Sequence, residues 1–244
     1  MARVWSYRHP ASGKHYEVRS AGSSLRLYTN GAFHSQFSPK HLFTGAVWDL
    51  LSIPALLIPQ RKRSRILMLG VGGGTAIHQL NRLLNPAQIV GIELDPVHIK
   101  VAKTYFGLTA TNIKLIQADA FTWMKQSRRK FDVIVDDLFV DAPGDPVRPF
   151  NTNRLWLNKL QSSLTTRGVL IQNHLSPKSA KLSAKSADWF STALLFTTPQ
   201  YENAVLALYQ QPVEVKPALA GMKTSIEQID KRALGKLKYR VKRV

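Results

Sequence analysis

Short apolar runs alternate with helix-like segments through the middle of the chain. The apolar runs have strand length and stand at residues 66–69, 89–92, 113–116, 131–135 and 168–172. Segments with helical spacing lie between or after them, at residues 75–84, 96–105, 152–163 and 176–190. Continuous apolar strands separated by helices are typical of a parallel sheet that is covered on both faces. The pattern therefore predicts an α/β fold.

The two ends of this pattern look different. Residues 1–36 show short β segments, and Asn30-Gly31 is a strong hairpin signal because both residues tolerate a positive φ. Residues 41–57 have helical spacing, and Pro54 should end or kink that helix. Two closing strands are expected at residues 193–196 and 204–209. They are too close together for a crossover helix, so the last of seven strands should be antiparallel.

Composition narrows the function classes. The 244 residues include 34 Lys+Arg and 15 Asp+Glu, which gives a net charge of +19, and they include no cysteine. Disulfides, cysteine–zinc sites and thiol nucleophiles are therefore excluded. The N-terminus has no apolar signal segment, and the most apolar run, residues 50–59, is too short to span a bilayer. We expect a cytoplasmic protein without membrane contact, and the charge leaves open either a nucleic-acid partner or a merely solvated basic surface.

The few acids are concentrated at predicted strand ends. Eight of the fifteen lie between Glu93 and Asp145. Among them, Glu93, Asp119 and the pair Asp136/Asp137 end three consecutive predicted strands. Ligands of open parallel sheets bind at the carboxyl ends of the strands, so these acids mark a candidate ligand edge.

A glycine-rich turn ends the first apolar strand at the same edge. Its glycines, Gly70, Gly72 and Gly74, would let a ligand approach the backbone, and the following helix offers free amides. Glu93 follows these glycines at a spacing in the sequence that is typical of an acid that accepts hydrogen bonds from ribose hydroxyls. Thr75 replaces the third glycine of the dinucleotide fingerprint, and Asp119 is placed to accept from an adenine amino group. These features favour an adenosyl-sulfonium cofactor, and an NAD(P)-dependent oxidoreductase is a minor alternative.

Five sequence motifs of the chain resemble those of a known family. The motifs are RILMLGVGGGTAIHQL, IVGIELDPVHIKVAKTYF, IKLIQADAFTWM, FDVIVDDLFVDAPGDP and GVLIQNHLSP. They resemble class I S-adenosylmethionine (SAM)-dependent methyltransferases and, among these, the spermidine synthase (polyamine aminopropyltransferase) group, over residues 24–210. The resemblance implies a Rossmann-like, seven-stranded, mostly parallel sheet with an antiparallel last strand. It also implies an N-terminal β-hairpin extension (1–40) and a SAM-binding catalytic domain (41–211). The composition changes at Pro212, and residues 212–244 are expected to form a basic C-terminal tail.

The resemblance also implies roles for individual residues. The cofactor-binding residues are Gly70, Gly72, Gly74, Glu93 (ribose), and Asp119 with Ala120 (adenine). Asp137 takes the place of the catalytic aspartate, and Asp141 falls near the second acid of that loop. His174 follows the fifth strand and is a candidate for lining the acceptor pocket. No metal site is expected, because the histidines lack ligand spacing.

Two positions depart from the spermidine synthase pattern. Gly73 stands where that group has an aspartate for the aminopropyl amine, and residues 43–45 stand where it has a Tyr-His-Glu cluster. Both changes remove contacts to a diamine or to the donor. The expected activity is therefore transfer of an aminopropyl or a methyl group, from decarboxylated or intact SAM, to a small nucleophile such as an amine. A SAM-fold nucleic-acid-associated protein or methyltransferase is the alternative, and a homodimer is a candidate assembly because related enzymes are often dimers.

Overall fold

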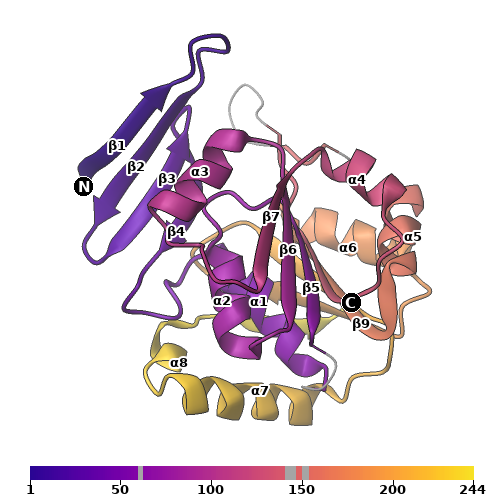
Figure 1. Ribbon diagram of the computed structural model, residues 1–244. Helices are drawn as coiled ribbons and strands as arrows, with labels where there is room; N and C mark the ends of the chain where they lie inside the picture. Colours follow the sequence, from indigo (N-terminus) through magenta and orange to yellow (C-terminus); the bar gives the residue numbers. More distant parts are fainter. Residues whose placement is uncertain (60–62, 141–146, 150–153) are drawn as a thin grey trace.

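The strands of the protein form two separate sheets. The computed structural model describes residues 1–59, 63–140, 147–149 and 154–244. Within these residues, a small sheet holds the N-terminal strands and a larger one holds the rest (Figure 1). From one edge to the other, the larger sheet consists of β12 (Arg240–Arg243), β10 (Thr192–Thr197), β11 (Ala204–Tyr209), β9 (Leu164–His174), β8 (Phe131–Asp136), β5 (Arg65–Leu69), β6 (Gln88–Glu93) and β7 (Ile113–Gln117).

The strand directions confirm the predicted α/β, Rossmann-like architecture. The five neighbouring strands from β9 to β7 are parallel, and β11 lies antiparallel between β9 and β10. In the register, Leu69 at the end of β5 pairs with Ile92 of β6 and Asp136 of β8. The carboxyl ends of these strands therefore meet at one edge, where the predicted ligand site lies.

Helices cover both faces of the larger sheet. One face carries α1 (Val47–Ser52), the 3-10 helix η1 (Ile53–Leu57), α2 (Thr75–Leu84) and α7 (Val215–Ile229). The other face carries α4 (Ala120–Gln126), α5 (Arg154–Ser162) and α6 (Pro177–Ser186). A further helix, α3 (Pro96–Thr104), packs along β6 and β7, and the short α8 (Ala233–Lys236) follows α7.

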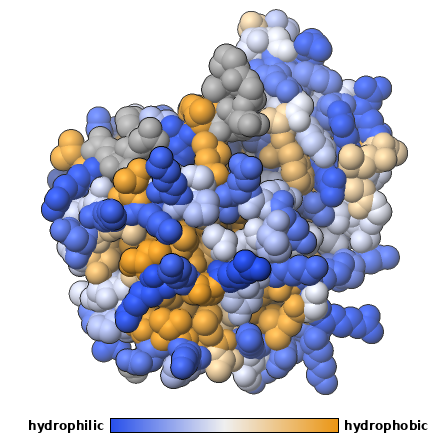
Figure 2. Space-filling model, turned by 180° about the vertical axis from the view of Figure 1, so that it is seen from behind, coloured by the Kyte–Doolittle hydropathy of each residue, from blue (hydrophilic) through white to orange (hydrophobic). Residues whose placement is uncertain are grey.

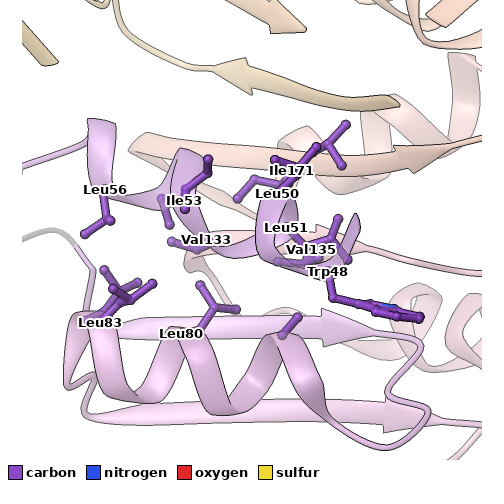
Figure 3. Packing of buried hydrophobic residues seen from close by; sticks show 14 of the residues in the cluster. Trp48, Leu50, Leu51, Ile53, Leu56, Leu80, Leu83, Val133, Val135 and Ile171 are labelled. Atoms are coloured by element: carbon purple, nitrogen blue, oxygen red, sulfur yellow. The ribbon is translucent and has the colours of Figure 1, made fainter. Parts of the chain in front are cut away.

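The continuous apolar strands are explained by this layering. Ile66 and Met68 of β5 point into the first helical layer, whereas Leu67 and Leu69 point into the second. Figure 3 shows the first layer, in which Leu50 and Leu80 pack over the strands. Each fully buried side chain of this size contributes about 1.5–3 kcal/mol to stability. The burial holds the strand ends, and so the site, in fixed positions.

The N-terminal region is larger than the predicted hairpin. It is a four-stranded antiparallel sheet of β1 (Ala2–Arg8), β2 (His15–Ala21), β3 (Ser24–Thr29) and β4 (Ala32–Phe37). Asn30 and Gly31 form the predicted turn between β3 and β4, with φ of 49° and 84°. The inner face of this sheet buries Val18 and Leu27 against Val101 and Phe106, at and just after the end of α3. This contact places β4 beside the glycine turn.

Two expectations about the elements were wrong. The helix expected at residues 41–57 is shorter: Gly45 has a φ of 79°, the α-helix covers only Val47–Ser52, and η1 continues it across Pro54. The larger sheet has eight strands in the described part of the chain, not seven, because β12 pairs with β10. An edge strand tolerates charged residues and needs few apolar contacts, so its sequence carries a weak signal.

The C-terminal segment forms the helices α7 and α8 and adds the strand β12 to the larger sheet, so its end is hydrogen-bonded to the body of the protein. The division of the chain near residues 40 and 211 stays a prediction. No helix in the described residues is long and apolar enough to cross a membrane.

Candidate active site

The glycine turn is tightly packed against the end of β8. Gly70, Gly72 and Gly74 have φ values of 80°, 53° and 84°, a conformation that favours glycine. A Cβ on Gly70 would lie 2.3 Å from the carbonyl oxygen of Asp137. Only a glycine lets the turn come this close to the backbone at Asp137, so the turn and the catalytic candidate are adjacent.

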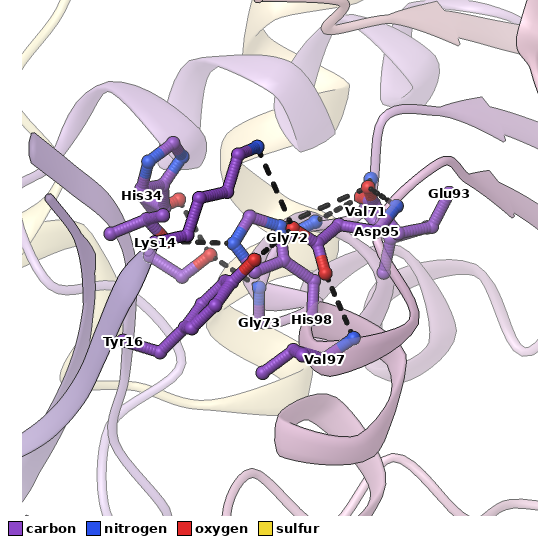
Figure 4. Close-up of polar contacts among 12 residues, drawn as sticks. Lys14, Tyr16, His34, Val71, Gly72, Gly73, Glu93, Asp95, Val97 and His98 are labelled. Carbon is purple, nitrogen blue, oxygen red and sulfur yellow. Dashed lines mark hydrogen bonds and ion pairs between the residues drawn. The ribbon is translucent and has the colours of Figure 1, made fainter. Parts of the chain in front are cut away.

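Glu93 ends β6 and organises the turn. Its Oε2 accepts hydrogen bonds from the amides of Val71 (2.8 Å) and Gly72 (2.9 Å), and its Oε1 accepts from the Asp95 amide (2.9 Å). Burial alone would raise the pKa of Glu93, but the adjacent His98 and these amides lower it to about 2. Glu93 is therefore ionised at neutral pH, and Figure 4 shows it beside Val71, Asp95 and Gly72.

The N-terminal sheet reaches this cluster with three side chains. Ser35 of β4 accepts a hydrogen bond from the Gly73 amide (2.7 Å). The Tyr16 hydroxyl donates to Asp95 Oδ2 (2.7 Å), and Thr29 Oγ1 lies 2.8 Å from His98 Nε2. The sheet thus fixes the β6–α3 turn and the glycine turn relative to each other.

Gly73 has no space for a side chain. A Cβ at this position would lie 2.8 Å from the Ser35 Cβ and 2.9 Å from the ring of Phe106. The aspartate of the spermidine synthase pattern would not fit here without movement of these neighbours. The glycine at this position therefore agrees with the close packing around it.

Asp119 is the N-cap residue of α4 and lies just after the end of β7. Its Oδ1 accepts from the amide and the hydroxyl of Thr122, at 2.8 and 2.7 Å, and these bonds lower the pKa of Asp119. The residue is exposed, and Oδ2 accepts no hydrogen bond from the described residues. Ala120 follows as the first residue of the helix. Capping uses one oxygen, and the other is open to a ligand.

The two acids at the end of β8 have different surroundings. Asp136 is fully buried, and its Oδ2 accepts from Arg148 (2.7 Å), Trp156 (3.1 Å) and Gln172 (2.9 Å). Burial would raise its pKa, but the Arg148 guanidinium and the hydrogen bonds from Gln172 and Trp156 together outweigh burial and lower it. Asp136 is thus a structural anion, which agrees with its absence from the predicted site.

Asp137 has only one hydrogen-bond donor to its carboxylate among the described residues. Asn173 Nδ2 donates to its Oδ1 at 2.8 Å, and the side chain of Asn203 donates to Asn173 Oδ1 at 3.2 Å. Burial raises the pKa of Asp137 to about 7, with a smaller contribution in the same direction from Asp136. A carboxyl group that titrates near neutral pH at a ligand edge is a candidate general base.

His174 lies beside this pair, at the end of β9. It is 1% exposed, and its Nε2 has no hydrogen-bond partner in the described part of the chain. Burial lowers the pKa of His174 to about 3, so its imidazole is neutral at pH 7. Asp141 lies outside the described residues. Sequence reasoning missed Asn173, although its position one residue before His174 on a strand end could have indicated it.

A methyltransferase domain model matches residues 60–220, more than half of the sequence. The chain belongs to the methyltransferase domain family. This membership confirms the predicted resemblance to SAM-dependent transferases, and the strand order of the larger sheet agrees with it.

Polyamine aminopropyltransferases are among the relatives that the chain matches. The polyamine aminopropyltransferase of Mycobacterium tuberculosis is 30% identical over 144 residues, which are 55% of this chain and 26% of the relative. Polyamine aminopropyltransferase 1 of Streptomyces coelicolor is 31% identical over 121 residues, 46% of this chain and 22% of the relative. The chain thus spans about a quarter of the length of these two relatives.

Solved structures of the same fold cover more of the chain. A probable spermidine synthase from Corynebacterium glutamicum covers 100% of this chain and 91% of its own, with a TM-score of 0.77 and 16% identity. Human methyltransferase-like protein 13, solved in complex with SAH, covers 75% of this chain and 90% of its own, with a TM-score of 0.64 and 21% identity. These similarities establish the fold, and the site roles stay predictions.

Proposed function

We propose that the protein transfers an aminopropyl group from decarboxylated SAM to an amine acceptor. The observation that carries the proposal is Asp137, a carboxyl with a pKa of about 7 that lies against the glycine turn at the carboxyl edge of the sheet. The similarity to polyamine aminopropyltransferases supports the choice of donor and acceptor. The decarboxylated donor would supply an activated sulfonium carbon.

The residues at the edge are compatible with the adenosyl part of such a donor. Glu93 is ionised and lies beside the turn, so it could accept from ribose hydroxyls while it keeps its amide contacts. Asp119 Oδ2 could accept from the adenine amino group. The positive-φ glycines keep the turn free of side chains, so a ligand can approach its backbone.

Asp137 would act on the acceptor. Its pKa allows the carboxylate to bind an ammonium group and to take its proton near neutral pH. Asn173 holds the carboxylate in place, and the neutral His174 would offer an uncharged hydrogen-bonding group to the acceptor without repelling a cation. Alignment of the two reactants then supplies most of the acceleration, since a sulfonium leaving group needs no acid.

Methyl transfer from intact SAM is the second candidate, and the closed space at Gly73 favours it. Without a carboxylate at this position, the turn offers no counter-charge to the amine of the aminopropyl group. The acceptor would still be bound at Asp137. The two candidates therefore differ in the donor and in the group that it transfers, and they share the acceptor site.

Calorimetric titration of the protein with each donor separates the candidates. Tighter binding of decarboxylated SAM supports aminopropyl transfer, and tighter binding of intact SAM supports methyl transfer. The variant Glu93→Gln should weaken both donors, whereas Glu202→Gln, outside the proposed site, should weaken neither. If the folded protein binds neither donor, the proposal is wrong. The homodimer stays a prediction that sedimentation can test.

A further inference from the structure

One face of the protein carries unpaired cations that the proposed transferase activity does not use. They are Lys178, Lys181 and Lys185 on α6, and Arg240 and Lys242 on β12, which we call the cationic edge. We infer that the cationic edge binds the phosphate backbone of a nucleic acid. The inference is independent of the group that the site transfers.

The lysines of α6 form a stripe along the helix. Lys178, Lys181 and Lys185 are separated by three and four residues, so they lie on one side of the helix, and all three are exposed. Ala180 and Ser183 are fully buried on the side that packs on the sheet. The stripe therefore faces away from the buried side, with its charges about one helical turn apart.

The cations of β12 project to the same side of the sheet. Val241 packs into the cluster under α7, so its neighbours Arg240 and Lys242 point to the opposite face. Lys242 pairs with Leu195, which belongs to the cluster under α6. Residues two apart on a strand are about 6.6 Å apart. The strand thus adds a second short row of charges on the α6 side.

These charges are not neutralised by the protein. In the described part of the chain, none of the five forms a salt bridge or a side-chain hydrogen bond, and neither α6 nor β12 contains an acid. Four further exposed cations precede β12, at positions 231, 232, 236 and 238. Unpaired like charges repel one another, so this density lowers stability unless an anion is bound.

A nucleic acid fits this arrangement better than the alternatives. Charged side chains on an edge strand prevent it from pairing with another chain, which would account for Lys242 but not for the lysine stripe on α6. An anionic membrane is the main competitor, because Figure 2 shows long hydrophilic side chains projecting around an apolar area on the back of the molecule. However, Leu182 is the one large apolar side chain exposed on α6 in the described residues, which is little to insert into a bilayer. Rows of evenly spaced cations match a linear polyanion.

The test measures binding of fluorescent 20-base-pair DNA and 20-nucleotide RNA by anisotropy over a range of salt concentrations. The edge variant carries Lys178→Gln, Lys181→Gln, Lys185→Gln, Arg240→Gln and Lys242→Gln. The matched control carries Lys100→Gln, Lys103→Gln, Lys114→Gln, Lys125→Gln and Arg128→Gln. The control removes the same charge from exposed positions near the opposite edge of the sheet, around α3, β7 and α4.

We expect the edge variant to bind at least about ten-fold more weakly at 50 mM salt than the control. The magnitude of the slope of log affinity against log salt should fall by up to about 4.5, since each of the five lost phosphate contacts removes about 0.9 for a duplex. Thermal unfolding of both variants checks that they fold. Equal losses in the two variants, no binding by the wild type at 100 mM salt, or binding only to vesicles that contain phosphatidylserine would each overturn the inference.

Discussion

Removal of the Asn173 amide should make Asp137 a weaker acid. Asn173→Ala deletes the hydrogen bond at 2.8 Å, which stabilises the charged form of the carboxyl. A hydrogen bond to a charged group contributes about 1.5–3 kcal/mol, and 1.36 kcal/mol corresponds to one pH unit. The pKa of Asp137, about 7 in the wild type, should therefore rise by about 1 to 2 pH units.

The assay is the pH dependence of kcat/KM for transfer, which reports ionisations of the free enzyme. The acidic limb of the Asn173→Ala profile should move upward, so that the rate at pH 7 falls roughly 5- to 50-fold and recovers at high pH. The titration of the amine acceptor is common to both enzymes and cancels in the comparison. Asn203→Ala is the matched control, because Asn203 contacts Asn173 but not Asp137.

A rate loss that is the same at every pH would refute this reasoning. It would mean that Asn173 supports the structure of the site without influencing the charge of Asp137. An unchanged pH profile of kcat/KM would show that the ionisation of Asp137 does not control the rate.

Three further predictions concern the same edge. Asp137→Asn should stabilise the fold above pH 7, by up to about 4 kcal/mol, and have little effect near pH 4. The reason is that the pKa of Asp137 in the folded protein, about 7, exceeds the ordinary 3.8, so the stability of the wild type falls as pH rises between these values. Urea unfolding of both proteins at several pH values measures the difference. The lowered pKa of Glu93 contributes stability that is present above pH 4.5 and is lost as pH falls toward 2. Glu93→Gln should remove this contribution, so the free energy of unfolding of the variant should depend less on pH in this window. Gly73→Asp should lower the free energy of unfolding by about 1–3 kcal/mol, because the new side chain would contact Ser35 and Phe106. Adding Ser35→Gly to the Gly73→Asp variant should restore part of the lost melting temperature, whereas equal melting temperatures of Gly73→Asp and wild type would contradict the close packing at Gly73.

The sequence predicted the part of the fold that depends on hydrophobic periodicity. The apolar runs at residues 66–69 and 89–92 correspond to β5 and β6, because buried parallel strands need apolar residues on both faces. The strand β12 was missed, since an edge strand of Arg and Lys has no such pattern. The helix at residues 41–57 was overextended, because periodicity does not reveal the positive φ of Gly45.

The sequence predicted those residues of the candidate site that lie at the end of a predicted strand. Glu93, Asp119 and Asp137 all lie at the carboxyl edge, as the position rule requires. The partners of these residues were not predictable, because Ser35, Thr29 and His98 meet only through the packing of the N-terminal sheet. The different states of Asp136 and Asp137 likewise depend on Arg148 and Asn173, which are distant in sequence.

The proposed role of Asp137 is to promote group transfer from a SAM-type donor to an amine. Mass spectrometry of the product that forms from a diamine and decarboxylated SAM measures this role, with wild type and Asp137→Asn in parallel. We expect the aminopropylated amine with the wild type and a large loss of product with a variant that still binds the donor. Equal product from the two proteins, or none from a wild type that binds both reactants, would contradict the account.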